Sequence, residues 1–476
     1  MGFKEYASYD GLGLAALVAK KKVKPIELME EAIARAEALN PKLNAIVYKD
    51  YERARKTAKG KLPKGAFTGV PFLIKDIACA VEGLPSRQGS RFMPNFPAPA
   101  DSYLGAKFKA AGLIPFATTN VPEFGLVAST ESKLYGPAHN PWDLSRSTGG
   151  SSGGSGAAVA AGIVPMAHAN DGGGSIRIPA SANGLVGLKP SRGRISQGPA
   201  FPDALDGIAT DLVVSRTVRD TAAVLDAVRG YMPGDPYAEP PGPASFLAAS
   251  KKKPKKLRVA VTLKKLDGRE LHPDCIAAAK RAAKLCEDLG HDVEEAMPNL
   301  PQDTLMAAFD SFWQGGLAAG LDMIGQLTGQ EPTRQLLEGV TWALYQSGKK
   351  VTASGYLAAK HVINTASREV ARFHETYDVW ITPTLGRPPE KNGVFDFDND
   401  DAAISFGPQY EYVPFTPMQN ITGTPAINIP LFWNKENLPV GTQFAARFGD
   451  EETLLRLAAQ LEKAQPWFQR YATIKP

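Results

Sequence analysis

Hydrophobic and polar residues follow one another along this chain in two patterns, helical repeats and short apolar runs. Residues 25–39, PIELMEEAIARAEAL, carry Ile26, Met29, Ile33 and Ala36 at the spacing of one helix face. A helix with one apolar face packs that face against the body of the protein. This segment therefore predicts an amphipathic helix that begins near its proline.

A second pattern consists of apolar runs too short for helices. Residues 68–78, TGVPFLIKDIA, form such a run, interrupted only by the charged pair Lys75 and Asp76. Runs of this length with branched and aromatic residues are typical of buried strands. Further strands are predicted at 113–120, 257–263, 291–296, 378–384, 425–431 and 439–446, and further helices at 102–112, 156–165, 218–231 and 275–290.

Alternation of strands and helices indicates an α/β fold. Residues 302–376 interrupt it, because they are mostly helical in pattern and rich in aromatic and aliphatic side chains, namely Phe309, Phe312, Trp313, Leu317, Trp342 and Tyr345. No internal repeat of fixed period is present. The pattern predicts one domain with a helical insertion.

Residues 232–256 are rich in proline and end in the basic run KKKPKK. Such a run could be a nuclear signal or a patch for polyanions, or it could be a solvated linker. The modest charge of the whole chain favours the linker.

Composition narrows the class of protein. The 476 residues are 43% hydrophobic and 22% charged, with a formal net charge of +5, which does not indicate a nucleic-acid or membrane partner. Cys79, Cys275 and Cys286 lack metal-ligand spacing, and their odd number argues against a disulfide framework. Six scattered histidines make a zinc hydrolase an unfavourable interpretation. Without a secretory pattern or a long apolar run, the expected location is the cytoplasm.

Two glycine tracts carry the candidate chemistry, GGSSGGSG at 149–156 and DGGGS at 171–175. Neither has the lysine of a phosphate-binding loop or the spacing of a dinucleotide fingerprint. A flexible linker is a poor interpretation, because both tracts continue directly into apolar segments. Ser151 lies in a GxSxG pattern, but polar residues precede it, whereas the α/β-hydrolase elbow follows an apolar strand.

Acyl transfer requires a nucleophile, a base and donors for the oxyanion. Ser175 follows three glycines whose N–H groups can converge without side-chain obstruction. His168 is the nearest histidine, but its segment suits a hydrogen bond within the core. A lysine can act as base when burial lowers its pKa, and Lys75 lies in an apolar run. From that run alone, a strand-end lysine whose amine reaches solvent is the favoured interpretation.

Three segments together resemble the amidase signature family: GVPFLIKDIA, STGGSSGGSGAAVAAG and DGGGSIRIPASANGLVGLKPS. AGLIPFATTNVPEFG, NPWD, SRTVRD and NITGTPAINIP extend the resemblance to about residues 10–465. It implies a central mixed β-sheet flanked by many α-helices in a single domain, 1–476. Its expected parts are N-terminal helices (1–60), a catalytic core (65–230), a linker loop (232–256), a helical insertion shaping the substrate pocket (302–376) and a return to the sheet with a C-terminal helix (378–476).

The resemblance also implies roles for individual residues. Ser175 would be the nucleophile, Ser151 the bridging serine after a cis peptide bond, and Lys75 the base. The oxyanion hole would use the N–H groups of Gly172, Gly173, Gly174 and Ser175. The residues expected to support the site are Ser152, Asp171 and Arg177. No metal or cofactor is implied.

Within that family, the chain is most similar to the branch of nylon-oligomer cyclic-dimer hydrolases, aryl acylamidases and carbamate-cleaving amidases. The expected substrates are neutral, hydrophobic aryl amides and carbamates, with the 6-aminohexanoate cyclic dimer as the alternative. The glutamine amidase subunit of a tRNA-dependent amidotransferase is an alternative of another class. We expect a monomer or homodimer that acts on a small molecule.

Overall fold

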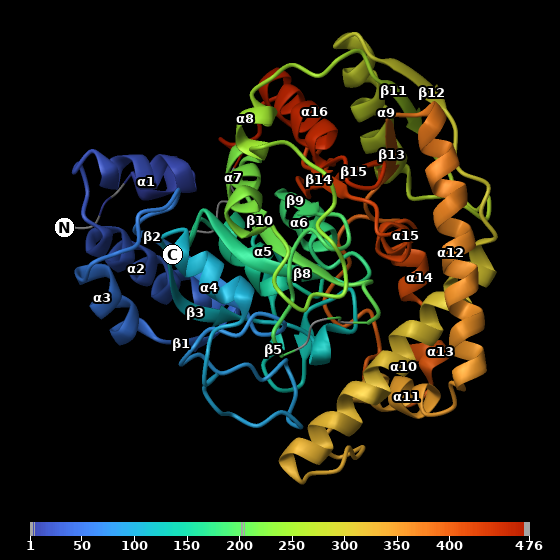
Figure 1. Ribbon diagram of the computed structural model, residues 1–476, viewed down its shortest axis with the longest axis horizontal. Helices are drawn as coiled ribbons and strands as arrows, with labels where there is room; N and C mark the ends of the chain where they lie inside the picture. Colours follow the sequence, from blue (N-terminus) through green and yellow to red (C-terminus); the bar gives the residue numbers. More distant parts are fainter. Residues whose placement is uncertain (1–2, 4, 201–202, 204, 471–476) are drawn as a thin grey trace.

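A mixed β-sheet runs through the centre of the molecule (Figure 1). The computed structural model describes residues 3, 5–200, 203 and 205–470. Within them the sheet has eleven strands, in the spatial order β1 (Ile46–Lys49), β3 (Leu113–Thr119), β2 (Val70–Lys75), β8 (Met166–Asp171), β10 (Thr210–Ser215), β9 (Val186–Lys189), β14 (Ala426–Ile429), β15 (Thr442–Ala446), β13 (Val379–Pro383), β11 (Arg258–Val261) and β12 (Asp292–Glu295). Two small hairpins stand apart, β4 (Glu131–Ser132) with β5 (Gly136–Pro137) and β6 (His139–Asn140) with β7 (Asp143–Ser147).

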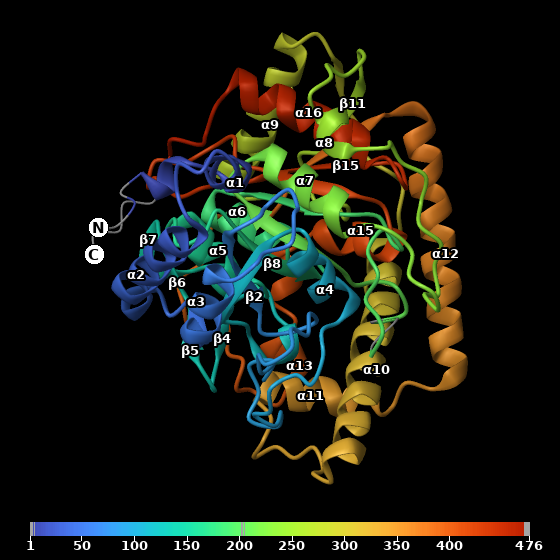
Figure 2. The same cartoon turned by 60° about the vertical axis from the view of Figure 1, so that its left-hand side comes forward.

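Helices surround this sheet, which confirms the predicted α/β class. The N-terminal helices α1–α3 lie on one side of the molecule and α10–α12 on the opposite side in both views (Figures 1 and 2). The helices are α1 (Gly11–Ala19), α2 (Pro25–Leu43), α3 (Tyr51–Lys59), α4 (Tyr103–Ala110), α5 (Gly153–Ala160), α6 (Arg177–Asn183), α7 (Val218–Val228), α8 (Phe246–Ser250), α9 (Pro273–Asp288), α10 (Gln302–Thr328), α11 (Gly339–Gly348), α12 (Ala353–Thr376), α13 (Ala402–Ser405), α14 (Gln409–Tyr412), α15 (Thr416–Thr422) and α16 (Glu451–Ala464), with 3₁₀ turns η1 (Tyr6–Ser8) and η2 (Glu123–Gly125).

The predicted amphipathic helix at 25–39 is α2, which begins at Pro25 and buries Met29, Ile33 and Ala36. The apolar run at 68–78 contains β2, all six of whose residues are buried between β3 and β8. A strand buried on both faces needs apolar side chains throughout, so its run lacks alternation. Hydrophobic pattern therefore located both elements.

The helix predicted at 156–165 is shifted in the structure. The helix α5 begins at Gly153, inside the first glycine tract, and ends at Ala160. Beyond it, Gly162 adopts a left-handed conformation with φ +71°, and the Ile163 N–H donates to the Ala158 carbonyl. This turn closes the helix and directs the chain into β8.

The segment 232–256 is not purely a linker loop, which corrects the prediction. Its residues 246–250 form α8, with Phe246 fully buried. The carboxylate of Asp226 on α7 accepts hydrogen bonds from Ser245 and from the N–H groups of Phe246 and Leu247. The sequence did not predict α8, because the many prolines that precede it are typical of irregular chain.

No helix in the described part of the chain is long and apolar enough to cross a membrane.

Candidate active site

The central strands bring the candidate residues to one edge of the sheet. The strands β2 and β8 are parallel neighbours, with Leu73 opposite Ala167. Their carboxyl ends therefore lie at the same edge, where β2 ends at Lys75 and β8 at Asp171. The second glycine tract follows immediately after β8, so Lys75 and the tract lie close together.

Lys75 is buried, with 1% of its surface exposed. Its Nζ donates to Ser151 Oγ at 2.7 Å and to the side-chain oxygen of Asn170 at 2.5 Å. Burial lowers the pKa of this amine to about 7, although the charges of Asp211 and Asp171 act in the opposite direction. Near neutral pH a large fraction of Lys75 is thus an uncharged amine that can accept a proton.

Ser151 is presented by the first glycine tract at the start of α5. The peptide bond Gly150–Ser151 is cis, and Ser151 is buried. Ser152 directly precedes the helix and donates from its hydroxyl to the Asn170 carbonyl at 3.2 Å. The two tracts thus meet, because Asn170 contacts both Ser152 and Lys75.

Ser175 lies at the end of the second tract, two residues before the start of α6. Ser175 is 7% exposed, and its hydroxyl has no hydrogen-bond partner among the residues that the structure describes. The structure therefore leaves this oxygen available to an incoming group. In the described structure, Ser151 and Ser175 are not hydrogen-bonded to each other.

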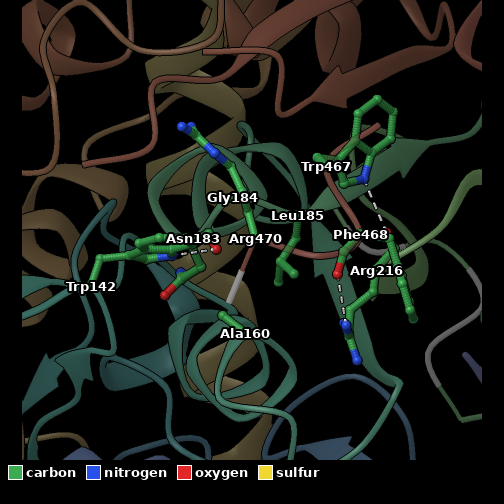
Figure 3. Close-up of a pocket in the computed structure, with 9 residues that line it drawn as sticks. All are labelled: Trp142, Ala160, Asn183, Gly184, Leu185, Arg216, Trp467, Phe468 and Arg470. Atoms are coloured by element: carbon green, nitrogen blue, oxygen red, sulfur yellow. Dashed lines mark hydrogen bonds between the residues drawn. The ribbon is translucent and has the colours of Figure 1, made fainter. Parts of the chain in front are cut away.

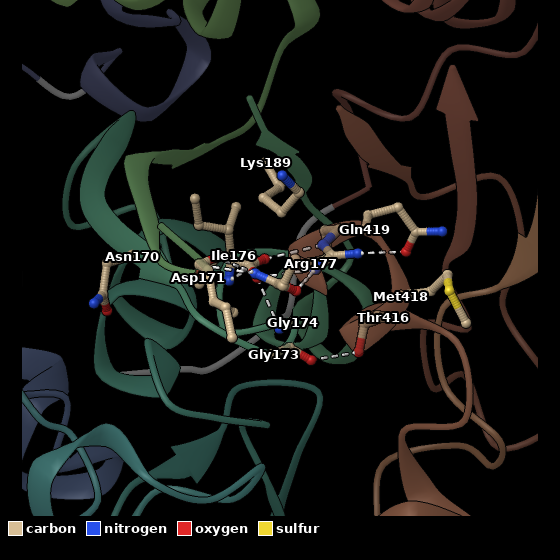
Figure 4. A network of polar contacts seen from close by, with 12 residues as sticks. Asn170, Asp171, Gly173, Gly174, Ile176, Arg177, Lys189, Thr416, Met418 and Gln419 are labelled. Carbon is tan, nitrogen blue, oxygen red and sulfur yellow. Dashed lines mark hydrogen bonds and ion pairs between the residues drawn. The ribbon is translucent and has the colours of Figure 1, made fainter. Parts of the chain in front are cut away.

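The buried pair of Asp171 and Arg177 braces the loop that carries Ser175 (Figure 4). Arg177 donates to both oxygens of Asp171 at 2.9 Å, and its charge helps to lower the Asp171 pKa to about 2, against the effect of burial. Asp171 in turn accepts from the N–H groups of Gly174 at 2.7 Å and Ile176 at 3.1 Å. Ser152, Asp171 and Arg177 therefore all adjoin the tracts.

One expected oxyanion donor does not fit its role. The Gly174 N–H points to Asp171 Oδ1, and a carboxylate holds such a donor strongly. This N–H is therefore not available to a substrate oxygen. By contrast, the N–H groups of Gly172, Gly173 and Ser175 have no acceptor among the described residues.

Aromatic side chains of α10 cover the first two glycines of this loop. A Cβ placed on Gly172 would lie 2.9 Å from the ring of Trp313, and one on Gly173 would lie 3.3 Å from the ring of Phe309. The two rings stack at a centroid distance of 5.2 Å. An apolar wall thus adjoins the N–H groups that remain unpaired.

His168 has the core role expected from its segment. Its Nδ1 accepts from the Lys75 backbone N–H at 3.3 Å, and its Nε2 lies 3.2 Å from Asp211 Oδ1. Burial lowers its pKa. Because Nδ1 accepts a hydrogen bond, the proton of the ring is assigned to Nε2, which faces Asp211. The ring supports the end of β2, and neither of these hydrogen bonds involves Ser151 or Ser175.

Sequence reasoning missed several polar side chains around the two tracts. Asn170 was not singled out, although it is an amide that directly precedes Asp171. The other missed side chains come from the C-terminal part of the chain and are Thr416, Gln419, Asn420 and Gln443. The segment NITGTPAINIP, which contains Asn420, was the available signal, but nothing in it showed which residue faces the site.

A separate shallow hollow lies at the C-terminal end of α6 (Figure 3). None of the residues that line it is a serine, a lysine or an acid. They are Trp142, Ala160, Asn183, Gly184, Leu185, Arg216, Trp467, Phe468 and Arg470. It therefore lacks a nucleophile and a base. Among the described residues no cluster of three histidine, cysteine or acidic side chains could hold a metal ion.

Comparison with known proteins identifies the family. The family model described as Amidase matches residues 27–455. The chain belongs to the amidase signature family. It is 36% identical over 474 residues to the 6-aminohexanoate-cyclic-dimer hydrolase of Paenarthrobacter ureafaciens, covering 97% of this chain and 96% of that protein.

Solved structures of this family are similar over almost the whole chain. A structure of 6-aminohexanoate cyclic dimer hydrolase has a TM-score of 0.93 at 36% identity, covering 98% of this chain and 99% of the other. A bacterial aryl acylamidase has a TM-score of 0.88 at 26% identity, with the same coverage. The protein is therefore a hydrolase of amide C–N bonds. The chain is thus more similar to the 6-aminohexanoate cyclic dimer hydrolase, at 36% identity, than to the aryl acylamidase, at 26%.

Proposed function

We propose that this amidase cleaves small neutral amides through an acyl-enzyme on Ser175, with Ser151 as proton relay and Lys75 as base. The observation that carries the proposal is the buried Lys75 amine, 2.7 Å from Ser151 Oγ, with its pKa lowered to about 7. A general base works best when its pKa lies near the working pH. The open hydroxyl of Ser175 supports its role as nucleophile.

In the first half of the reaction, Ser175 Oγ forms a bond to the amide carbonyl carbon. Its proton passes to Ser151 Oγ as the proton of Ser151 passes to the lone pair of neutral Lys75. The tetrahedral intermediate then collapses, and its C–N bond breaks. The proton returns from Lys75 through Ser151 to the departing nitrogen, which leaves as the amine, while Ser175 Oγ stays bonded to the acyl group.

In the second half, a water oxygen attacks the ester carbonyl of the acyl-enzyme and gives its proton to the same relay. The bond between Ser175 Oγ and the acyl carbon breaks, Ser175 regains a proton, and the carboxylic acid leaves. In both halves the N–H groups of Gly172, Gly173 and Ser175 would stabilise the oxyanion, at about 3–4 kcal/mol per donor.

For the substrate, we propose a short aliphatic amide of the 6-aminohexanoate cyclic-dimer type. The likeness to hydrolases of that substrate extends over nearly the whole chain. The stacked rings of Trp313 and Phe309 would provide an apolar surface for a methylene chain. Aryl amides are the second candidate, with carbamates beside them, supported by the likeness to the aryl acylamidase and by the same aromatic wall.

The test compares turnover of 6-aminohexanoate cyclic dimer, 4-nitroacetanilide, methyl N-phenylcarbamate and glutamine. Preference for the cyclic dimer supports the first candidate, and preference for the anilide or carbamate supports the second. Turnover of glutamine alone would reject both. Ser175→Ala should abolish activity and Lys75→Ala should lower it at least about 10³-fold, whereas Lys284→Ala, at an exposed lysine paired with Asp288, should leave it unchanged. Full activity of Ser175→Ala would overturn the mechanism.

A further inference from the structure

Thr416, the first residue of α15, makes a direct contact with the loop that carries Ser175 (Figure 4). Its hydroxyl is buried and donates to the Gly173 carbonyl at 2.7 Å. A Cβ placed on Gly174, whose φ is +133°, would lie only 2.3 Å from Thr416 Oγ1. The threonine thus fills the space that the glycine leaves.

The Gly173–Gly174 peptide is therefore held at both of its polar ends. Thr416 holds its carbonyl oxygen, and Asp171 Oδ1 holds its N–H. Because a peptide unit is planar, two opposed hydrogen bonds fix the orientation of the whole plane. The neighbouring N–H groups of Gly173 and Ser175 flank this plane, so their directions depend on it.

Asn420, one turn later on α15, holds Asp171, whose carboxylate accepts from the N–H of that peptide. Its amide donates to the Asp171 carbonyl at 2.9 Å and to Asp171 Oδ1 at 2.8 Å. Its oxygen accepts from Arg177 at 2.6 Å. One short helix thus contacts both the carbonyl of the peptide and the carboxylate that holds its N–H.

We propose that Thr416 is a positioning residue that sets the direction of the oxyanion donors, with Asn420 supporting it through Asp171. This inference rests on the proposed acyl-enzyme mechanism. Oxyanion donors are effective only when their N–H groups already point to where negative charge develops. Removing the Thr416 hydroxyl frees the Gly173 carbonyl and lets the peptide rotate.

The test uses Thr416→Val, which removes the hydroxyl while keeping the branched shape, and Thr416→Ser, which keeps the hydroxyl. With hexanoyl 4-nitroanilide we expect Thr416→Val to lower kcat about 10- to 100-fold with little change in KM. Thr416→Ser should recover most of kcat. The matched control is Thr422→Val on the same helix, whose hydroxyl donates to the Met418 carbonyl and does not contact the glycine loop.

Inhibition by hexanal separates positioning from general structural damage. An aldehyde forms a tetrahedral adduct with a serine nucleophile, so its inhibition constant reports on the oxyanion donors. In Thr416→Val this constant should rise by the same factor by which kcat/KM falls. Melting temperatures of the variants identify any that are poorly folded, and Thr416→Ser then provides the comparison.

Unchanged kcat and hexanal inhibition in Thr416→Val would overturn this inference. A fall in activity that Thr416→Ser does not recover, or that Thr422→Val reproduces, would overturn it as well. These results differ from failure of the proposed function, which would appear as activity of Ser175→Ala in the same assay.

Discussion

The burial of a single amine is the basis of the chemistry proposed for this site. The charged form of Lys75 loses its hydration in the core, and this cost exceeds the attraction of Asp211 and Asp171. The same feature distinguishes Lys75 from the lysines that lie exposed at the surface of the protein. Burial therefore converts an ordinary cation into a candidate base.

The first prediction concerns pH. Because only neutral Lys75 can accept a proton, kcat/KM should rise with pH and level off above about 7. Lys75→Arg should lose at least about 10³-fold of kcat/KM at every pH, since a guanidinium remains protonated. The measurement is a pH–rate profile of both proteins.

A second buried lysine provides the control for this profile. Burial also lowers the pKa of Lys189 to about 7, but among the described residues the one hydrogen-bond acceptor of its Nζ is the Pro190 carbonyl. Lys189→Met should therefore keep the acid limb of the profile in place. If the acid limb disappears in Lys189→Met, the limb reports the titration of Lys189, and the assignment of Lys75 as the base is contradicted.

The second prediction concerns Gly174. Its φ of +133° disfavours other residues, and an added Cβ would collide with Thr416. Gly174→Ala should destabilise the protein by about 2–4 kcal/mol, as strain and overpacking combine. Gly173→Ala, whose Cβ would meet Phe309 at 3.3 Å, should cost about 1 kcal/mol. Urea unfolding measures the loss of stability in both variants. Equal losses would contradict the close contact between Gly174 and Thr416.

At the scale of elements, α10 contributes the apolar wall of the site. Phe309 and Trp313 are one helical turn apart, so both rings face the glycine loop. Sequence placed aromatic residues in this helical region, but it could not show which of them reach the glycines.

The third prediction follows from this wall. Trp313→Ala should open the space beside Gly172 and change the ratio of kcat/KM for cyclic dimer and anilide by about tenfold or more. Trp342→Ala on α11 is the matched control, because its ring packs against Tyr345. The measurement is the specificity ratio of each variant. An unchanged ratio in Trp313→Ala would remove this helix from substrate selection.

At the scale of the whole molecule, a pair of buried acids joins distant parts of the chain. Glu123 accepts from the Glu338 backbone N–H at 2.8 Å, and Glu338 accepts from the Lys133 N–H at 2.6 Å. Burial and the charge of Glu123 raise the Glu338 pKa to about 8. Both carboxyls cannot ionise in the core without cost.

The fourth prediction follows from that pKa. A carboxyl whose pKa is raised by folding binds more protons when folded, so its stabilising contribution is lost as pH rises from about 4.5 to 8. Glu338→Gln should remove this loss. The melting temperature of the variant should fall less than that of wild type between pH 5 and 9. Glu331→Gln, at an exposed position, should behave like wild type; if Glu338→Gln does too, the pair does not control stability.

The sequence predicted the elements that have strong apolar signals and the family that carries the motifs. β2 and α2 could be located because burial imposes their patterns. α8 could not, since Asp226, which holds its start, lies on another helix. The Thr416 contact joins residues 243 positions apart, and the orientation of the Gly174 N–H depends on where Asp171 points. Such contacts depend on the fold and leave no local pattern.

The most direct test of the account is mass spectrometry of the protein quenched during turnover of hexanoyl 4-nitroanilide. We predict a hexanoyl adduct on the peptide that contains Ser175, absent from Ser175→Ala and accumulating only slowly in Lys75→Ala. An adduct on another residue, or full turnover by Ser175→Ala, would contradict the proposed acyl-enzyme.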